Sequence, residues 1–136
     1  MNQPSLTPDQ ITILGPVDSA ALEAREVIRK FHEAFDGHDA HAMEDLVAED
    51  CIIENTGPAP DGARLVGRAA CLANWQAIAR STGTRFVREE VFVVGERVVI
   101  RWRYCWGDDD ASSIRGLNLM RVQGGRIVEA MGYVKA

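Results

Sequence analysis

The chain has no excess of positive charge, few cysteines and no long apolar run, and each shortage excludes a class of protein. Its 136 residues carry 15 Lys and Arg against 20 Asp and Glu, a net charge of −5. Without a basic field, neither nucleic acid nor an anionic membrane is expected as a partner. No apolar stretch approaches the roughly 20 residues that cross a bilayer. The first residues have neither a basic start nor an apolar core, so no secretory leader is expected.

Cysteine and histidine are equally sparse. Cys51, Cys71 and Cys105 are an odd number at wide spacing and form no CxxC motif, which is typical of free thiols in a reducing compartment. We therefore expect a cytoplasmic protein. His38 and His41 are close neighbours, but zinc usually takes about four ligands and no further cluster completes such a set. Neither a metal nor another cofactor is expected.

The hydrophobic content points to one folded domain. Hydrophobic residues make up 46% of the sequence, which is enough for a substantial core at this length. Residues 1–18 hold three prolines and are predicted to form an irregular N-terminal arm. Residues 19–136 then form a single domain.

Three helices are predicted in the first 80 residues. Apolar positions at helical spacing run from an N-cap at Ser19 to about Phe35. Gly37 ends this helix, and Asp39 caps a short second one. The third helix is predicted over 68–80.

The rest of the chain is predicted to be mostly β-structure. The expected strands are 51–56, 84–94, 97–106, 112–123 and 126–135. Gly116 and Gly132 lie inside long strands and indicate strong curvature. The pattern predicts an α+β fold, in which a cone-shaped, strongly curved antiparallel sheet wraps around three N-terminal helices. A cone of this kind leaves a pocket for a small molecule.

Three segments carry a resemblance to a known family. They are FHEAFDGHDAHAMEDLVAEDCIIEN from Phe31, GRAA at 67–70, and the C-terminal LNLMRVQGGRIVEAMGYVK. Together they resemble the nuclear transport factor 2-like superfamily, which includes SnoaL-like polyketide cyclases, ketosteroid isomerases and limonene epoxide hydrolases. The resemblance covers about residues 20–135. It implies a cystatin-like, SnoaL-like cone and a homodimer formed through the convex face of the sheet. Because the superfamily holds enzymes, binders and scaffolding subunits, the fold does not define the function.

Most catalytic residues of these relatives have no counterpart in this chain. Aligned without gaps, the isomerase tyrosine, proton-moving carboxylate and oxyanion aspartic acid fall at Phe31, Asn55 and Asn118. An amide neither takes up nor releases a proton near neutral pH, so Asn55 cannot be a general base. The carboxylates that activate water in the epoxide hydrolases are absent as well.

Strand 97–106 has two possible orientations, because side chains alternate between the two faces of a strand. The ungapped alignment turns Arg101 and Arg103 into the pocket, where they would bind an anionic ligand. Hydrophobicity instead turns Trp102, Tyr104 and Trp106 inward as an aromatic wall for a neutral ligand. We favour the aromatic wall, since burying apolar area contributes more free energy.

The sequence supports three functional hypotheses. The first is a domain that binds a small organic molecule, with ligand contacts from Phe31, Asn55, Trp75, Trp102, Asn118 and Met120. The second is an isomerase, cyclase or hydrolase that uses His32 or a Glu as acid/base and the amides of Asn55 and Asn118 as oxyanion donors. The third is a dimeric interaction module whose cone is filled by side chains.

Overall fold

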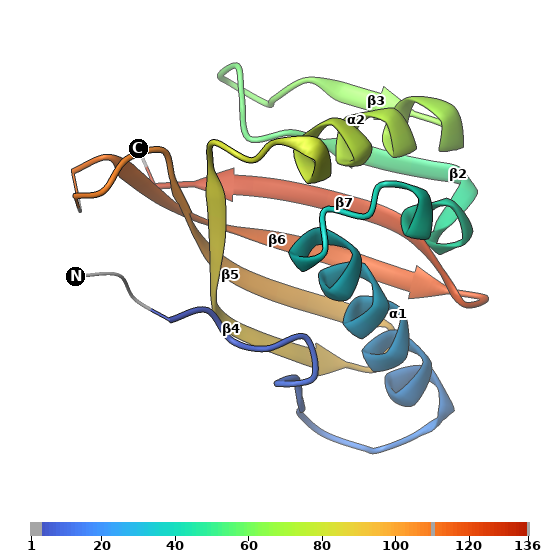
Figure 1. Cartoon of the computed structure of the whole chain (residues 1–136). Helices are drawn as coiled ribbons and strands as arrows, with labels where there is room; N and C mark the ends of the chain where they lie inside the picture. Colours follow the sequence, from blue (N-terminus) through green and yellow to red (C-terminus); the bar gives the residue numbers. More distant parts are fainter. Residues whose placement is uncertain (1–3, 110, 136) are drawn as a thin grey trace.

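The computed structural model describes residues 4–109 and 111–135. Its elements are β1 (Thr12–Ile13), α1 (Ser19–Asp36), the 3₁₀ helix η1 (His41–Leu46), β2 (Val47–Glu54), β3 (Arg64–Val66), α2 (Arg68–Arg80), β4 (Arg85–Val94), β5 (Arg97–Cys105), β6 (Ser113–Gln123) and β7 (Arg126–Val134). The seven strands form one sheet in the order β1-β4-β5-β6-β7-β2-β3. The helices α1 and α2 lie in front of this sheet (Figure 1). The α+β class predicted from the sequence is confirmed.

The sheet is mixed, whereas the sequence pattern predicted an antiparallel one. β4 to β7 form an antiparallel meander, but β2 runs parallel to β7, and β1 runs parallel to β4. The difference has a physical reason. The apolar pattern of a strand reports which of its faces is buried, but not which distant strand it pairs with.

The N-cap of helix α1 lies one residue earlier than predicted. The carboxylate of Asp18, not Ser19, accepts a hydrogen bond from the backbone N–H of Ala21 at 2.9 Å. Gly37 ends the helix, and its N–H donates to the carbonyl of Glu33. The buried face of the helix consists of Ala21, Ala24, Val27, Ile28, Phe31, His32 and Ala34. This is the stripe at helical spacing that packs against the sheet.

The second helix is a 3₁₀ helix, and the strand after it starts earlier than expected. The N-cap is Ala40 rather than the predicted Asp39, although the Asp39 carboxylate accepts a hydrogen bond from the N–H of Ala42 at 3.1 Å. β2 begins at Val47, four residues before the predicted start. The register against β7 shifts between Val47 and Ile52, so this strand is irregular. That irregularity hides its first half from a pattern of strict alternation.

Two further segments join the sheet. β3 pairs with β2 at Ile52–Glu54 and was not predicted. The N-terminal arm, predicted to be irregular, supplies β1 and follows the edge of β4. The N–H of Leu14 donates to the carbonyl of Val93 at 2.8 Å, and the N–H of Leu6 donates to the carbonyl of Arg88 at 3.0 Å.

Gly116 lets two strands and an indole approach closely. A Cβ atom at this position would lie 2.4 Å from the carbonyl oxygen of Tyr133 and 2.5 Å from the ring of Trp102. Only a residue without a side chain avoids both contacts.

We expect Gly116→Ala to lower the free energy of unfolding by about 1–3 kcal/mol, because the ring and the backbone must both shift. Urea denaturation measures this change. The matched control is Gly83→Ala, whose Cβ would have nothing within 4 Å; we expect a change within about 0.5 kcal/mol. Equal losses in the two variants would contradict the steric explanation.

Candidate functional site

A pocket of about 950 Å³ lies between the helices and the inner face of the sheet. Residues from α1, α2, β2 and the meander line it, and Ser5–Pro8 of the arm line one side. Six aromatic rings are part of its apolar wall: Phe31, Phe35, Trp75, Phe86, Trp102 and Tyr104. Its size and apolar lining are those of a site for a small organic molecule.

The rings form two connected groups. On the helix side, Phe31 meets Phe35 at 4.9 Å and Trp75 at 5.0 Å between ring centroids, both edge to face. On the sheet side, Phe86 meets Trp102 edge to face at 5.2 Å. Edge-to-face packing holds aromatic rings in place. The pocket therefore has one aromatic wall on the helix side and another on the sheet side.

The orientation of β5 follows its hydrophobicity. Trp102 is 6% exposed, and both it and Tyr104 line the pocket. Arg101 is exposed on the other face, where its Nε lies 3.4 Å from the carboxylate of Glu90. Arg103 donates to the hydroxyl of Ser113 at 2.7 Å. Arg101 and Arg103 do not line the pocket, so the orientation from the ungapped alignment is wrong; burying an indole is favourable, and burying unpaired guanidinium groups is costly.

Neutral polar groups gather at one part of the wall. The side-chain amide of Asn55 donates to the side-chain oxygen of Asn74 at 3.2 Å, and both residues line the pocket. Asn118 lines it from β6, beside Gly132: a Cβ at residue 132 would lie 3.3 Å from the Asn118 Oδ1 and 3.0 Å from Thr56. Gly132 thus leaves room for these polar side chains. Amides of this kind orient a carbonyl or a hydroxyl group.

Asn74 was missed in the sequence analysis. The sequence offered one indication of its role: Asn74 lies four residues before Ile78 on α2, and residues at this spacing share a helix face. Both residues line the pocket. Met120, by contrast, was predicted to contact the ligand but does not line the pocket. It is fully buried and pairs with Val98 and Ala130. Its strand position faces inward as expected, but the side chain is part of the core.

His32 is an uncharged group in the pocket wall. It is 4% exposed, and its Nδ1 is buried without a hydrogen-bond partner. Burial, helped by the positive charge of Arg88, lowers the pKa of His32 to about 3. The imidazole is therefore neutral near pH 7 and is a weak base.

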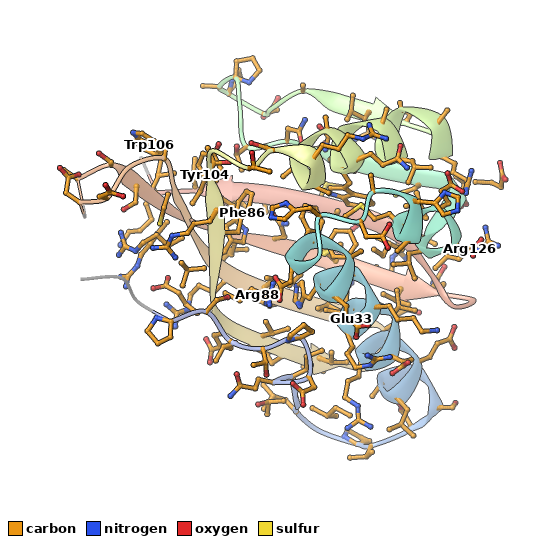
Figure 2. All side chains as sticks on the ribbon, viewed as in Figure 1. Glu33, Phe86, Arg88, Tyr104, Trp106 and Arg126 are labelled. Carbon is orange, nitrogen blue, oxygen red and sulfur yellow. The ribbon has the colours of Figure 1, made fainter. Side chains whose placement is uncertain are left out.

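Arg88 joins three parts of the molecule at the pocket. Its guanidinium group donates two hydrogen bonds to the carboxylate of Asp36 on α1, at 2.8 and 2.6 Å, and one to the carbonyl of Leu6 at 2.8 Å. The Arg88 N–H also donates to the hydroxyl of Ser5 at 2.9 Å. Arg88 points into the pocket from the same face of β4 as Phe86, in register with Trp102, and a bulge follows between Arg88 and Glu90. Sequence alternation gave no sign of the bulge. Figure 2 labels Arg88.

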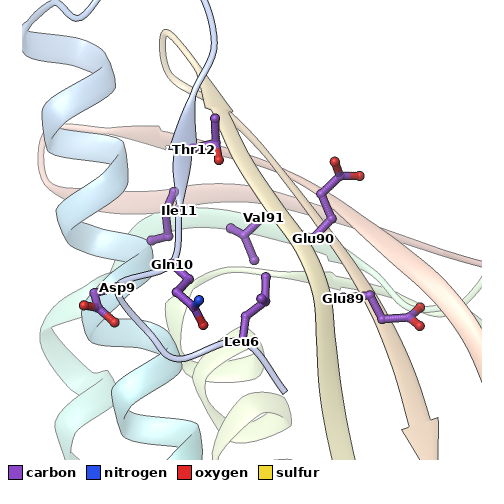
Figure 3. Close-up of a pocket in the computed structure, with 8 residues that line it drawn as sticks. All are labelled: Leu6, Asp9, Gln10, Ile11, Thr12, Glu89, Glu90 and Val91. Carbon is purple, nitrogen blue, oxygen red and sulfur yellow. The ribbon is translucent and has the colours of Figure 1, made fainter. Parts of the chain in front are cut away.

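A second hollow, of about 360 Å³, separates the arm from the edge of β4. Figure 3 shows Leu6, Gln10 and Ile11 on the arm beside Val91 of β4. Glu89 points away from the arm in this view, and its carboxylate is 3.0 Å from Arg115. The arm is therefore attached near Leu6 and again at β1, with open space in between.

The histidines near the second helix have structural partners. The Nδ1 of His38 lies 2.8 Å from the carbonyl of Ala79, and His41 is beside Glu44 at the surface. Across residues 4–109 and 111–135, no group of three or more His, Cys, Asp or Glu side chains is placed to hold a metal ion. In the same part of the chain, no helix is both long and apolar enough to cross a membrane.

Comparison with models of protein families identifies the family of this chain. The model of the SnoaL-like domain matches residues 28–130. The protein belongs to this family, as the sequence resemblance implied.

Solved structures agree with this placement. An NTF2-like protein of unknown function from Mesorhizobium loti is 54% identical, with a TM-score of 0.84 over 92% of this chain and 99% of that one. A putative ketosteroid isomerase from Kribbella flavida is 19% identical, with a TM-score of 0.69 over 85% and 80% of the two chains. An LEH-like epoxide hydrolase from M. tuberculosis is 15% identical, with a TM-score of 0.66 over 85% and 84%. The last two share the fold alone. No match was found among curated proteins.

The low pKa of His32 predicts a pH-dependent stability. The imidazole has a pKa near 6.5 in the unfolded chain and about 3 in the folded one. Between these values the unfolded chain binds a proton that the folded chain does not. As the pH falls below about 6.5, we therefore expect the free energy of unfolding to drop, by up to about 1.4 kcal/mol per pH unit from this residue.

Urea denaturation at pH 7, 6 and 5 measures the slope. His32→Leu removes the titrating group, so its free energy of unfolding should fall less steeply over this range. Arg88 and Asp36, the charged groups beside His32, are unchanged in this variant. The same slope in both proteins would refute the low pKa.

Proposed function

We propose that this SnoaL-like domain binds a neutral, largely apolar small organic molecule in the 950 Å³ pocket. The observation that carries the proposal is the combination of six lining rings with side-chain amides and a neutral imidazole. The charged Arg88 is already occupied by Asp36, and Arg85, at the mouth, also has an interaction partner. A ligand with its own charge would lose hydration without gaining a matching partner. A hollow of this volume also argues against an interaction module with a filled cone.

In this proposal, the aromatic residues and the amides of the pocket make different contributions to ligand binding. Phe31, Trp75 and Trp102 supply the apolar walls, where burial of ligand surface provides most of the free energy. Asn55 and Asn118 supply hydrogen bonds to a carbonyl or hydroxyl group, and so orient the ligand.

An isomerase, cyclase or hydrolase activity is the second candidate, because fold relatives include a putative ketosteroid isomerase and an epoxide hydrolase. Such chemistry needs a group that exchanges a proton near neutral pH. His32 has a pKa of about 3. The carboxylates of Asp36 and Glu54, at the pocket, are each paired with an arginine, Arg88 and Arg64. These contacts favour binding over acid/base catalysis.

A matched pair of probes tests the neutral character of the site. N-phenyl-1-naphthylamine and 1-anilinonaphthalene-8-sulfonate share one aromatic skeleton, but only the second is an anion. We expect the neutral probe to bind at least about tenfold more tightly, since burying the sulfonate without a free cation costs more than about 1.4 kcal/mol. Fluorescence titration measures both dissociation constants.

Two variants locate the binding. Ile114→Trp places a large ring in the pocket and should abolish binding of the neutral probe, whereas Gln123→Trp, on the same strand outside the pocket, should leave it unchanged. Tighter binding of the anion, or equal binding to Ile114→Trp and the unaltered protein, would defeat the proposal.

We also propose that the domain is a homodimer through the outer, convex face of the sheet. A row of half-buried apolar side chains crosses four strands there: Phe92, Val99, Leu119 and Met131, paired in register from β4 to β7. They alternate with inward, buried neighbours such as Val98 and Met120, so they do not serve the core. Exposed apolar rows flanked by charged side chains are typical of association surfaces.

Leu119→Arg tests the dimer. A charge in the middle of the apolar row should convert the protein to a monomer, because two copies would bring these charges together in the interface. Light scattering coupled to gel filtration at tens of micromolar measures the mass. Leu22→Arg, at an exposed leucine on α1, is the control and should stay dimeric. A monomeric unaltered protein, or a dimeric Leu119→Arg, would overturn this proposal.

We also propose that the protein is located in the cytoplasm. Cys51, Cys71 and Cys105 are free and buried, and burial raises the pKa of Cys51 and Cys71. Thiols in this state are unreactive and fit a reducing compartment.

A further inference from the structure

The aromatic wall of the pocket continues past the pocket itself. Four rings follow one another on the inner side of β4 and β5, and we call them the aromatic strip: Trp102, Phe86, Tyr104 and Trp106. Phe86 lies 5.2 Å from Trp102 and 4.8 Å from Tyr104 between centroids, and Tyr104 lies 6.0 Å from Trp106. The first three line the pocket, and Trp106 does not.

The strip leads from the core to the surface. Trp102 is 6% exposed, Phe86 and Tyr104 are half-buried, and Trp106 is 50% exposed. Figure 2 shows Phe86, Tyr104 and Trp106 in succession toward the turn that follows β5. Trp102 and Trp106 are four residues apart, about 13 Å along an extended strand.

The position of Trp106 is fixed by the backbone. Its N–H donates to the carbonyl of Ser112 at 3.0 Å, which extends the pairing of β5 with β6 by one residue beyond Cys105 and Ser113. The indole is therefore held on the inward-facing side of the strand, in line with Trp102 and Tyr104.

Single exposed apolar side chains are ordinary on protein surfaces, so exposure alone indicates nothing. Trp106 differs by its neighbour. Tyr133 is similarly exposed, at 56%, but its register partner Leu117 is on the outer face of the sheet. Trp106 is in ring contact with a residue of the pocket. A ligand that leaves the pocket along the strip meets the indole next.

We propose that Trp106 is a specificity-determining residue for an elongated ligand. The inner part of the ligand fills the pocket, and its outer, apolar part packs on the Trp106 indole. Ligands that end inside the pocket do not reach this ring, so Trp106 selects for length. The inference rests on the proposed binding function and adds the shape of the ligand class.

Two neutral probes of different length test the inference. 4-Ethylphenol is short enough to stay inside the pocket, and 4-octylphenol extends beyond the length of the strip. Equilibrium dialysis gives the dissociation constant of each with the unaltered protein, Trp106→Ala and Trp106→Phe. Tyr133→Ala is the control, because it removes a comparably exposed ring from the other face of the sheet.

We expect Trp106→Ala to weaken 4-octylphenol by about threefold to tenfold, the usual contribution of one aromatic contact. Binding of 4-ethylphenol should change by less than about twofold, and Trp106→Phe should recover most of the loss. Tyr133→Ala should alter neither probe.

Equal weakening of both probes by Trp106→Ala, or no weakening of the long one, would overturn the role of Trp106 while leaving the pocket in place. Failure of both probes to bind the unaltered protein would instead overturn the pocket assignment, and this inference with it.

Discussion

The pocket depends on the ion pair between Arg88 of β4 and Asp36 of α1. A guanidinium group taken out of water costs several kcal/mol unless it is paired and fully hydrogen-bonded. Arg88 is 4% exposed, and its two terminal nitrogens donate to both oxygens of Asp36 and to the carbonyl of Leu6, whereas its buried Nε has no partner. Arg88 belongs to β4, Asp36 to the end of α1 and Leu6 to the arm. Because the Asp36 side chain is 47% exposed, the pair contributes less to net stability than to position: it holds helix, sheet and arm around one hollow.

The same ion pair affects the charge state of the groups that line the pocket. The positive charge of Arg88 adds to burial in keeping the imidazole of His32 neutral, while Asp36 occupies the guanidinium group. Aromatic rings and the side-chain amides of Asn55, Asn74 and Asn118 are among the groups that face the interior. We propose that a cavity of this character recognises shape and a few hydrogen bonds rather than charge. In the same proposal, the aromatic strip extends this recognition outward, since its last ring is 50% exposed.

Regular elements could be predicted from the sequence, and irregular ones could not. α2 and β4–β7 match their predicted ranges within one residue at each end, because their apolar periodicity is continuous. The bulge at Arg88 and the early start of β2 break that periodicity, so their consequences were missed. The inward turn of Trp102 was favoured correctly by hydrophobicity, against an alignment that pointed to Arg101. Asn74 escaped notice although its spacing from Ile78 places both residues on one face of α2.

Amino-acid order alone was enough to specify the family, the α+β class, the helices and the meander, since these follow from local periodicity and from motifs along the chain. It also led to the prediction that the acids of the related enzymes have no counterpart in this chain. The tertiary structure decided the rest: the parallel pairing of β2 with β7, the pairing of Arg88 with Asp36, and the meeting of Asn55 with Asn74. Each of these joins residues far apart in the chain. Such contacts depend on how the elements pack together, and no local pattern records that packing.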